Sequence, residues 1–276
     1  MTQYNKAEIG RTAAQYGFVR DTFEKVLRLK EILEYFNTQE YLANHLLLKG
    51  GTAINLTVFN LPRLSVDIDM DYTPNDCKND MLAAREHITG LIKEYMERKG
   101  YSLSSGSRFS HSLDAFYYYY INAGGNKDMI KIELNYSLRT HIFESTYRSI
   151  LSDAFKSDIK IRTVDPLEIF AAKGNALISR AAARDLYDWG NMMEHNLFEN
   201  HRDLFPVIGK KDNFRLNERK NRAKQYIGEL MQLTEKENEY MDRFMAKEYR
   251  PELLFDDEKI MARICDHPMA LWKCST

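Results

Sequence analysis

The sequence has little cysteine and no long apolar run. Its three cysteines, Cys77, Cys265 and Cys274, show no C-x-x-C or Cys/His spacing, so neither a disulfide framework nor a structural zinc site is indicated. No apolar run approaches the roughly 20 residues that a transmembrane helix needs. The N-terminal residues, MTQYNKAEIGRTAAQYG, lack the charged and then apolar pattern of a signal peptide. We therefore expect a cytoplasmic protein.

A large net charge of either sign is also absent. The chain has 39 Lys and Arg against 40 Asp and Glu, a formal net charge of −1, so any nucleic-acid-binding surface must be local. One basic stretch exists between Lys210 and Lys224, with seven Lys or Arg residues and two acids. It either follows an RNA backbone or forms an ordinary solvated helix surface.

The pattern of the chain changes near residue 163. The 276 residues, 44% of them hydrophobic, are enough for one large domain or two modest ones. Strand and helix patterns alternate up to that point, and from Asp165 the patterns are helical, including a long charged stretch from Leu216 to Glu248. We predict an α/β domain with N-terminal helices over residues 1–163 and a helical domain over residues 164–276.

Several elements can be placed from their periodicity. Apolar residues recur at helical spacing to about Phe36, and Asp21 with Glu24 resembles a capping box at the start of that helix. A second helix is expected from Thr73 as N-cap to Gly100. Strand patterns occupy residues 101–110, 112–123 and 128–137, the last two joined as a hairpin. In FYYYY, residues 116–120, we expect alternate tyrosines to pack in the core rather than to stack on bases.

The stretch SVDIDMDY places acids at alternate positions of a predicted strand. Asp67, Asp69 and Asp71 would share one face, with the intervening apolar residues on the other. Like charges this close repel, and a divalent metal compensates them; carboxylate sites suit Mg²⁺ or Mn²⁺. For a D-x-D pattern alone, the alternative is a solvated acidic face on an edge strand.

A glycine turn precedes these acids by fifteen to nineteen residues. Gly50, Gly51 and Thr52 lie between the predicted strand LLLK and the short helix TAINLTVFN. Glycines there let the backbone approach a ligand, and free N–H groups favour phosphate; the alternative is a simple tight turn. A phosphate cradle near metal carboxylates is what phosphoryl transfer requires, because such sites act by positioning and charge neutralisation.

A third carboxylate is expected on a neighbouring strand. The strand pattern IKIELNYS offers Glu133, which shares its face with Lys131. A salt-bridged surface pair between these two residues is the alternative.

Taken together, these motifs resemble the AbiEii/AbiGii toxin family of nucleotidyltransferases. The matching segments are LLLKGGTAINL, LPRLSVDIDM, IKIELN and AAKGNALISRAAARDLYDW, spread over about half of the chain. The resemblance implies a polymerase-β-like nucleotidyltransferase fold, α/β (α+β) with a mixed sheet and a helical C-terminal half. It also implies a toxin of a toxin–antitoxin or abortive-infection system, with a cognate antitoxin as partner.

The resemblance also implies roles for individual residues in the first half. Gly51 and Thr52 match the family's phosphate-binding element, which Gly50 begins. Asp67 and Asp69 match its metal-binding pair, and Glu133 matches a less constant third acid.

Further positions match motifs around this centre. Arg63 and Ser65 match the positions just before the metal pair. Lys173 and Asp185 match later motifs that contact the nucleotide or organise the site; for Lys173 the alternative is a surface lysine with a snorkelling stem. Asp71 is an extra acid without a matched role.

We therefore expect a metal-dependent nucleotidyltransferase that moves a nucleoside monophosphate from an NTP to an acceptor hydroxyl, with Mg²⁺ or Mn²⁺ as cofactor. The expected acceptor is RNA, with tRNA the leading candidate within the family. The alternatives are a small-molecule or protein acceptor, a metal-dependent glycosyltransferase, and an inactive member that only binds. The Gly-Gly-Thr turn and the later motifs argue against a glycosyltransferase, and the presence of both Asp67 and Asp69 argues against an inactive member.

Overall fold

The computed structural model describes residues 4–61, 63–137, 139, 141–180 and 183–194. The chain divides between Asp165 and Pro166 into two compact units. The stretches Leu216–Glu248 and Lys210–Lys224, for which we predicted helix and a basic patch, lie outside the described residues. The predicted domains, 1–163 and 164–276, remain a prediction, because most of the second one lies there too.

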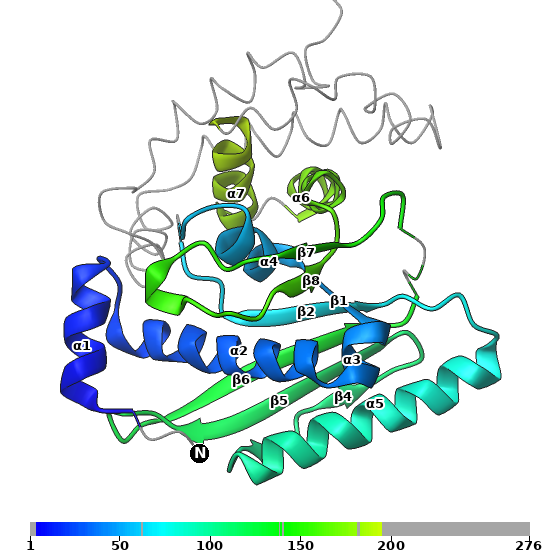
Figure 1. The fold of residues 1–276 in the computed structure, drawn as a ribbon, viewed down its shortest axis with the longest axis horizontal. Coiled ribbons are helices and arrows are strands. Elements are labelled where there is room, and N and C mark those ends of the chain that lie inside the picture. The colour runs from blue at the N-terminus through cyan, green and yellow to red at the C-terminus, as the bar shows by residue number, and fades with distance from the viewer. Residues whose placement is uncertain (1–3, 62, 138, 140, 181–182, 195–276) are drawn as a thin grey trace, which may run out of the picture. The chain divides into compact units, whose positions relative to one another are not determined.

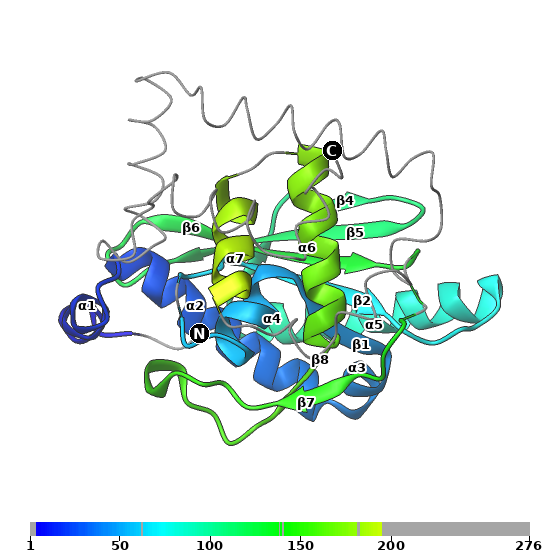
Figure 2. The same cartoon turned by 90° about the horizontal axis from the view of Figure 1, so that it is seen from above.

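An eight-stranded mixed sheet forms the centre of the first unit (Figure 1). The strand order is β3-β5-β6-β2-β1-β8-β7, and β4 pairs with β5 beside β3 (Figure 2). The strands are β1 (Leu46–Lys49), β2 (Asp67–Tyr72), β3 (Ser102–Leu103), β4 (Arg108–Phe109), β5 (Leu113–Ile121), β6 (Lys127–Asn135), β7 (Thr146–Arg148) and β8 (Ile161–Thr163). The pairs β2–β6 and β1–β8 are parallel, and the others are antiparallel. The predicted mixed α/β fold is confirmed for this part of the chain.

The two long helices of the first unit, α2 (Arg20–Thr38) and α5 (Lys78–Arg98), cover one face of this sheet. The other described helices of this unit are α1 (Lys6–Gln15), α3 (Glu40–His45) and α4 (Gly50–Thr57). The rings of Tyr35 on α2 and Tyr95 on α5 stack with centroids 3.8 Å apart. Ion pairs tie both helices to strands, from Lys25 to Asp128 at 2.7 Å and from Arg85 to Asp114.

Alternation along the central strands separates a core face from an outer face. Apolar side chains of β2 and β6 are buried toward the helices: Ile68, Met70, Ile130, Ile132 and Leu134. Because successive side chains of a strand point to opposite faces, the acids of β2 lie on the other face. This period-two pattern confirms the strand predictions for SVDIDMDY and for residues 128–137.

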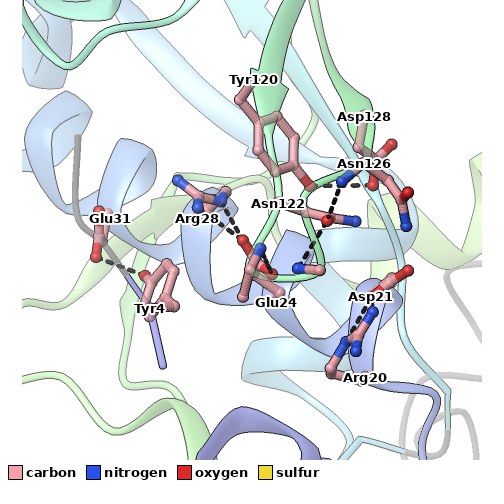
Figure 3. A network of polar contacts seen from close by, with 12 residues as sticks. Tyr4, Arg20, Asp21, Glu24, Arg28, Glu31, Tyr120, Asn122, Asn126 and Asp128 are labelled. Atoms are coloured by element: carbon pink, nitrogen blue, oxygen red, sulfur yellow. Dashed lines mark hydrogen bonds and ion pairs between the residues drawn. The ribbon is translucent and has the colours of Figure 1, made fainter. Parts of the chain in front are cut away.

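The helix predicted to run to Phe36 is confirmed as α2, but the predicted capping box of Asp21 with Glu24 is wrong. Val19 is the N-cap and makes no side-chain cap bond. Glu24 is instead fully buried, accepts two bonds from the Arg28 guanidinium at 3.0 and 2.6 Å, and accepts one from Ala123 N at 2.8 Å (Figure 3). A carboxylate that neutralises a buried guanidinium is not available to cap a helix.

The helix predicted from Thr73 to Gly100 begins later than expected. Cys77 is the N-cap of α5, so Thr73 and Pro74 are outside the helix. Thr73 N donates to His45 O at 3.0 Å, which continues the pairing of β1 with β2. The end of the helix agrees with the prediction, because Gly100 follows it with a φ of 80°.

The second unit contains two described helices, α6 (Pro166–Arg180) and α7 (Ala183–Glu194), both at the places that their sequence patterns predict. Gly174 of α6 packs against Trp189 of α7, so closely that a Cβ there would overlap the indole ring. None of the helices in the described part of the chain combines the length and apolarity that crossing a bilayer requires.

Candidate active site

Asp67 and Asp69 of β2 share one face of the sheet with two residues of β6. In the parallel register, Asp67 is the partner of Lys131, and Asp69 is the partner of Glu133. Register partners on neighbouring strands are roughly 4.8 Å apart and point to the same side. The structure therefore brings Asp67, Asp69 and Glu133 together, with Lys131 among them.

Negative charge at this centre is only partly compensated. Burial raises the pKa of Asp69 to about 6, and the charges of Asp67 and Glu133 add to this effect, while Lys131 opposes it. Lys131 Nζ lies 2.9 Å from Glu133 Oε2 and 4.0 Å from Asp67 Oδ2. Burial lowers the pKa of Lys131, but its bond to Glu133 and the neighbouring acids outweigh burial and raise it overall. One ammonium thus faces three carboxylates.

The third acid of β2, Asp71, has a separate partner. Its side chain is almost fully buried and forms an ion pair with Lys49, the last residue of β1. In the antiparallel register of β1 and β2, Asp71 lies opposite Leu47, and Lys49 lies opposite Asp69. Lys49 is a residue that the sequence reasoning missed, because the pairing of β1 with β2 cannot be read from either strand alone.

The glycine turn lies directly beside Asp69. Gly50 has a φ of 71°, a left-handed conformation that glycine adopts without strain. A Cβ at Gly50 would lie 2.6 Å from Asp69 Oδ2, and a Cβ at Gly51 would lie 2.8 Å from Arg63 Nη2 and 2.9 Å from Ser65 Oγ. The absence of side chains at both positions is therefore what lets Asp69, Arg63 and Ser65 converge on the start of α4.

Thr52 links this turn to the acidic strand. Its hydroxyl donates to the backbone oxygen of Asp67, and its side chain is buried. Arg63 is also buried and donates to Leu64 O at 3.4 Å. The positions of these residues are consistent with an anion cradle at the N-terminus of α4, where unpaired N–H groups and the helix dipole favour phosphate.

The donor set fits a metal that arrives together with a nucleotide. In the described part of the chain, no three or more His, Cys, Asp and Glu side chains are arranged as a complete metal site, and Glu133 is engaged by Lys131. Mg²⁺ is commonly held by only one or two carboxylates together with waters and substrate phosphates. Asp67 and Asp69 provide such a pair next to the glycine turn.

Lys173 and Asp185 meet in the second unit. Lys173 Nζ lies 3.3 Å from Asp185 Oδ1 and 2.7 Å from Asp188 Oδ2. Lys173 is 8% exposed, and both aspartates are buried, so the alternative of a snorkelling surface lysine is wrong. Asp188 makes the shorter of the two contacts, although the sequence reasoning did not name it as a partner of Lys173.

Two solved structures resemble the fold. JHP933 from Helicobacter pylori is similar with a TM-score of 0.53 and 17% sequence identity over 90% of each chain. MenT4, a nucleotidyltransferase toxin from Mycobacterium tuberculosis H37Rv, has a TM-score of 0.50 and 18% identity, over 69% of this chain and 65% of its own. At these identities the likeness concerns the fold alone. No curated protein is significantly similar to the chain in sequence.

The family comparison covers most of the chain. Residues 31–257 match the family described as nucleotidyl transferase AbiEii toxin of type IV toxin–antitoxin systems. The matched range includes the carboxylate centre, the glycine turn and the two described helices of the second unit. The resemblance seen in the sequence motifs is confirmed: this chain belongs to the AbiEii family of nucleotidyltransferase toxins of type IV toxin–antitoxin systems.

Proposed function

We propose that this toxin transfers a nucleoside monophosphate from an NTP to a hydroxyl group of RNA, with tRNA as the leading acceptor, in a reaction that depends on Mg²⁺ or Mn²⁺. The observation that carries the proposal is the placement of Asp67, Asp69 and Glu133 on one sheet face beside the Gly50–Gly51 turn. Phosphoryl transfer needs acids that hold a metal and, next to them, a cradle that binds the phosphates.

The glycine turn supplies the triphosphate site in this proposal. The N–H groups of Gly51 and Thr52 lie in the first turn of α4, which begins at Gly50, where they would donate to phosphate oxygens. Arg63 and Ser65, which lie against Gly51, add a cation and a hydroxyl donor. A guanidinium binds phosphate oxygens in a bidentate manner, which fixes the triphosphate for in-line attack.

Asp67 and Asp69 hold the metal in this proposal. When bound, the ion neutralises charge on the phosphate oxygens and favours departure of pyrophosphate. Glu133 is the third acid, either as a further ligand or as the base that takes the proton of the attacking hydroxyl. Its register with Asp69 serves both roles, and a metal titration of Glu133→Gln distinguishes them, since excess metal compensates for a weakened ligand set but does not replace a lost base.

Lys173 and Asp185 act as positioning residues in our proposal. The sequence motif suggests a contact of Lys173 with the triphosphate, but its ammonium is already shared by two buried acids. This arrangement supports a role in holding α6 against α7 better than direct contact with the nucleotide.

The antitoxin partner and the NTP substrate follow from the family, whereas the acceptor is proposed. A toxin of a type IV system has a cognate antitoxin as its partner, and NTP is its expected substrate. RNA as the acceptor, and the cytoplasm as the location where NTP and RNA meet, are parts of our proposal.

The test incubates the full-length protein with each labelled NTP, Mg²⁺ and total bacterial RNA. Label should enter RNA with wild type and not with Asp67→Asn combined with Asp69→Asn, and expression in cells should arrest growth only with wild type. Label on a small hydroxyl compound or on a protein, with none on RNA, would contradict the RNA acceptor. No transfer from any NTP would favour the inactive binding member, and transfer from a labelled nucleotide-sugar offered in a parallel assay would favour the glycosyltransferase.

A further inference from the structure

The outer face of the sheet continues from the carboxylate centre onto β5. In the antiparallel register of β5 with β6, Tyr117 is the partner of Lys131, and Ala115 is the partner of Glu133. Since Lys131 is also the partner of Asp67, Tyr117 lies two strands from Asp67 in one row. Two strand spacings correspond to roughly 10 Å between backbones.

The tyrosine run divides between the two faces. Phe116, Tyr118 and Tyr120 are buried toward the helices, as expected for packing residues. Tyr117 and Tyr119 are half-buried and lie on the outer face, the side of the acids. They are two residues apart, which along a strand corresponds to roughly 7 Å. The expectation that alternate tyrosines of this run pack in the core is therefore confirmed for Tyr118 and Tyr120.

Cations accompany the outward tyrosines. The Lys127 ammonium lies 3.7 Å from the centroid of the Tyr119 ring, and Lys131 is the partner of Tyr117. On β4, Arg108 is exposed and is the partner of Ala115. On the outer face of β6, Glu133 and Lys131 belong to the carboxylate centre, and Met129 and Lys127 follow them away from that centre.

We propose that this tyrosine face, made of Arg108, Tyr117, Tyr119, Lys127 and Met129, binds a single-stranded segment of RNA and leads its end to the carboxylates. Half-exposed aromatic rings stack on bases without regard to sequence, and neighbouring cations follow the phosphates. Sheet faces that carry two or three such aromatics bind single-stranded RNA in this way. The inference deepens the proposed function, because it rests on RNA as the acceptor.

Single-stranded RNA fits this face better than a duplex does. Stacking on Tyr117 and Tyr119 requires bases that are splayed out, whereas a duplex presents phosphates and 2′-hydroxyls. Positive charge at Lys127 and Arg108 complements the phosphates, and the continuous row from Tyr117 to Asp67 places a strand end near the reacting groups.

The test measures binding of a short fluorescein-labelled single-stranded oligoribonucleotide to the full-length protein in a salt series. Tyr117→Ala and Tyr119→Ala should each weaken binding roughly tenfold, as loss of one stacked base does. The corresponding Phe variants should bind like wild type, because a phenyl ring keeps the stacking surface. Lys127→Ala should flatten the slope of log affinity against log salt by about 0.7 unit. Tyr147→Ala is the matched control, since Tyr147 is an exposed tyrosine on β7 at the other edge of the sheet.

Binding unaffected by the Ala variants, or equally weakened by Tyr147→Ala, would overturn the inference. Loss of NTP binding with intact oligonucleotide binding would also overturn it, because the rings would then stack on the nucleotide substrate. The proposed function is tested separately: if these tyrosines bind the oligonucleotide but no RNA is ever labelled, the tyrosine face stands and the RNA acceptor fails. If RNA is labelled equally well by both Ala variants, the acceptor stands and the tyrosine face fails.

Discussion

Asp69 and Glu133 are register partners on the parallel strands β2 and β6, so two acids stand side by side on one face of the sheet. Acids in this arrangement repel, and Lys131 is the ammonium that lies against Glu133. Protonation of the Asp69 carboxyl group, or binding of a cation, relieves both the repulsion and the cost of burying this negative charge. The stability of the metal-free protein and its affinity for a metal should therefore respond to pH in opposite directions.

The first prediction concerns the pH dependence of stability. The pKa of Asp69 is raised from 3.8 to about 6, so the folded state holds this proton more tightly than the unfolded state. The resulting cost is fully present above pH 6 and is relieved as the pH falls toward 4; it is on the order of 3 kcal/mol. Asp69→Asn should be more stable than wild type at pH 7 and equal to it near pH 4, as measured by urea unfolding followed by circular dichroism.

Metal affinity depends on the protonation of the same carboxyl group, that of Asp69. Apparent Mg²⁺ or Mn²⁺ affinity of wild type with NTP should fall below pH 6, because the proton competes with the metal for the carboxylate. Asp71→Asn is not a suitable control, because it would leave Lys49 without its partner. Asp80→Asn is suitable, because Asp80 is an exposed residue in the first turn of α5. A stability difference between Asp69→Asn and wild type that does not change from pH 7 to pH 4 would contradict the prediction.

The second prediction concerns ligand binding at the acids. Mg²⁺ with an NTP at about a hundredfold excess over its Kd should raise the Tm of wild type by roughly 5 to 10 °C, because it binds only the folded state. Asp67→Asn combined with Asp69→Asn should lose this increment and keep or exceed the Tm of the metal-free wild type, because repulsion is removed. A large loss of metal-free Tm would mean that the acids are structural.

The third prediction concerns the glycine turn. Gly51→Ala places a Cβ 2.8 Å from Arg63 Nη2 and 2.9 Å from Ser65 Oγ, so these groups must move. Loss of one charged contact to phosphate should weaken NTP binding about 10- to 100-fold, as measured by calorimetry. The matched control is Gly90→Ala on α5, where a Cβ would meet nothing within 4 Å and helix propensity should slightly stabilise the fold. Equal NTP affinity in the two variants would argue against the cradle.

Much of the candidate site could be read from the sequence, because its signals are local. The alternation of Asp67 and Asp69 with buried Ile68 fixes which face the acids share, and Gly50 and Gly51 mark the turn beside them. The same alternation placed Glu133 on its strand. What the sequence does not contain is the order of the strands in the sheet, and the exact register of Asp69 with Glu133 depends on that order.

The features that were missed depend on contacts between distant segments. The ion pair of Lys49 with Asp71 needs the pairing of β1 with β2, and the buried Glu24 needs the hairpin after β5. The strands β7 and β8 have three residues each, too few for a period to show. Thr73 has the residue type of an N-cap, but its backbone is held by His45, and this tertiary contact overrides the local preference.

The fourth prediction concerns Lys173, which lies between Asp185 and Asp188 in the second unit. Lys173→Met leaves two buried carboxylates without this partner, and breaking a buried ion pair in this way costs about 3 to 5 kcal/mol. The measurement is urea unfolding followed by fluorescence in a Trp272→Phe background, which leaves Trp189, packed on Gly174, as the reporter.

A rescue experiment separates positioning from contact with the nucleotide. Adding Asp185→Asn and Asp188→Asn to Lys173→Met removes the buried charges, so most of the lost stability should return, since replacing a whole buried ion pair is often neutral. If Lys173 is a positioning residue, the increment in Tm with Mg²⁺ and NTP should return along with stability in this triple variant. If Lys173 instead contacts the triphosphate, the increment should stay lost in both variants, although stability returns in the triple variant. That outcome would restore the role that the sequence motif suggested for Lys173.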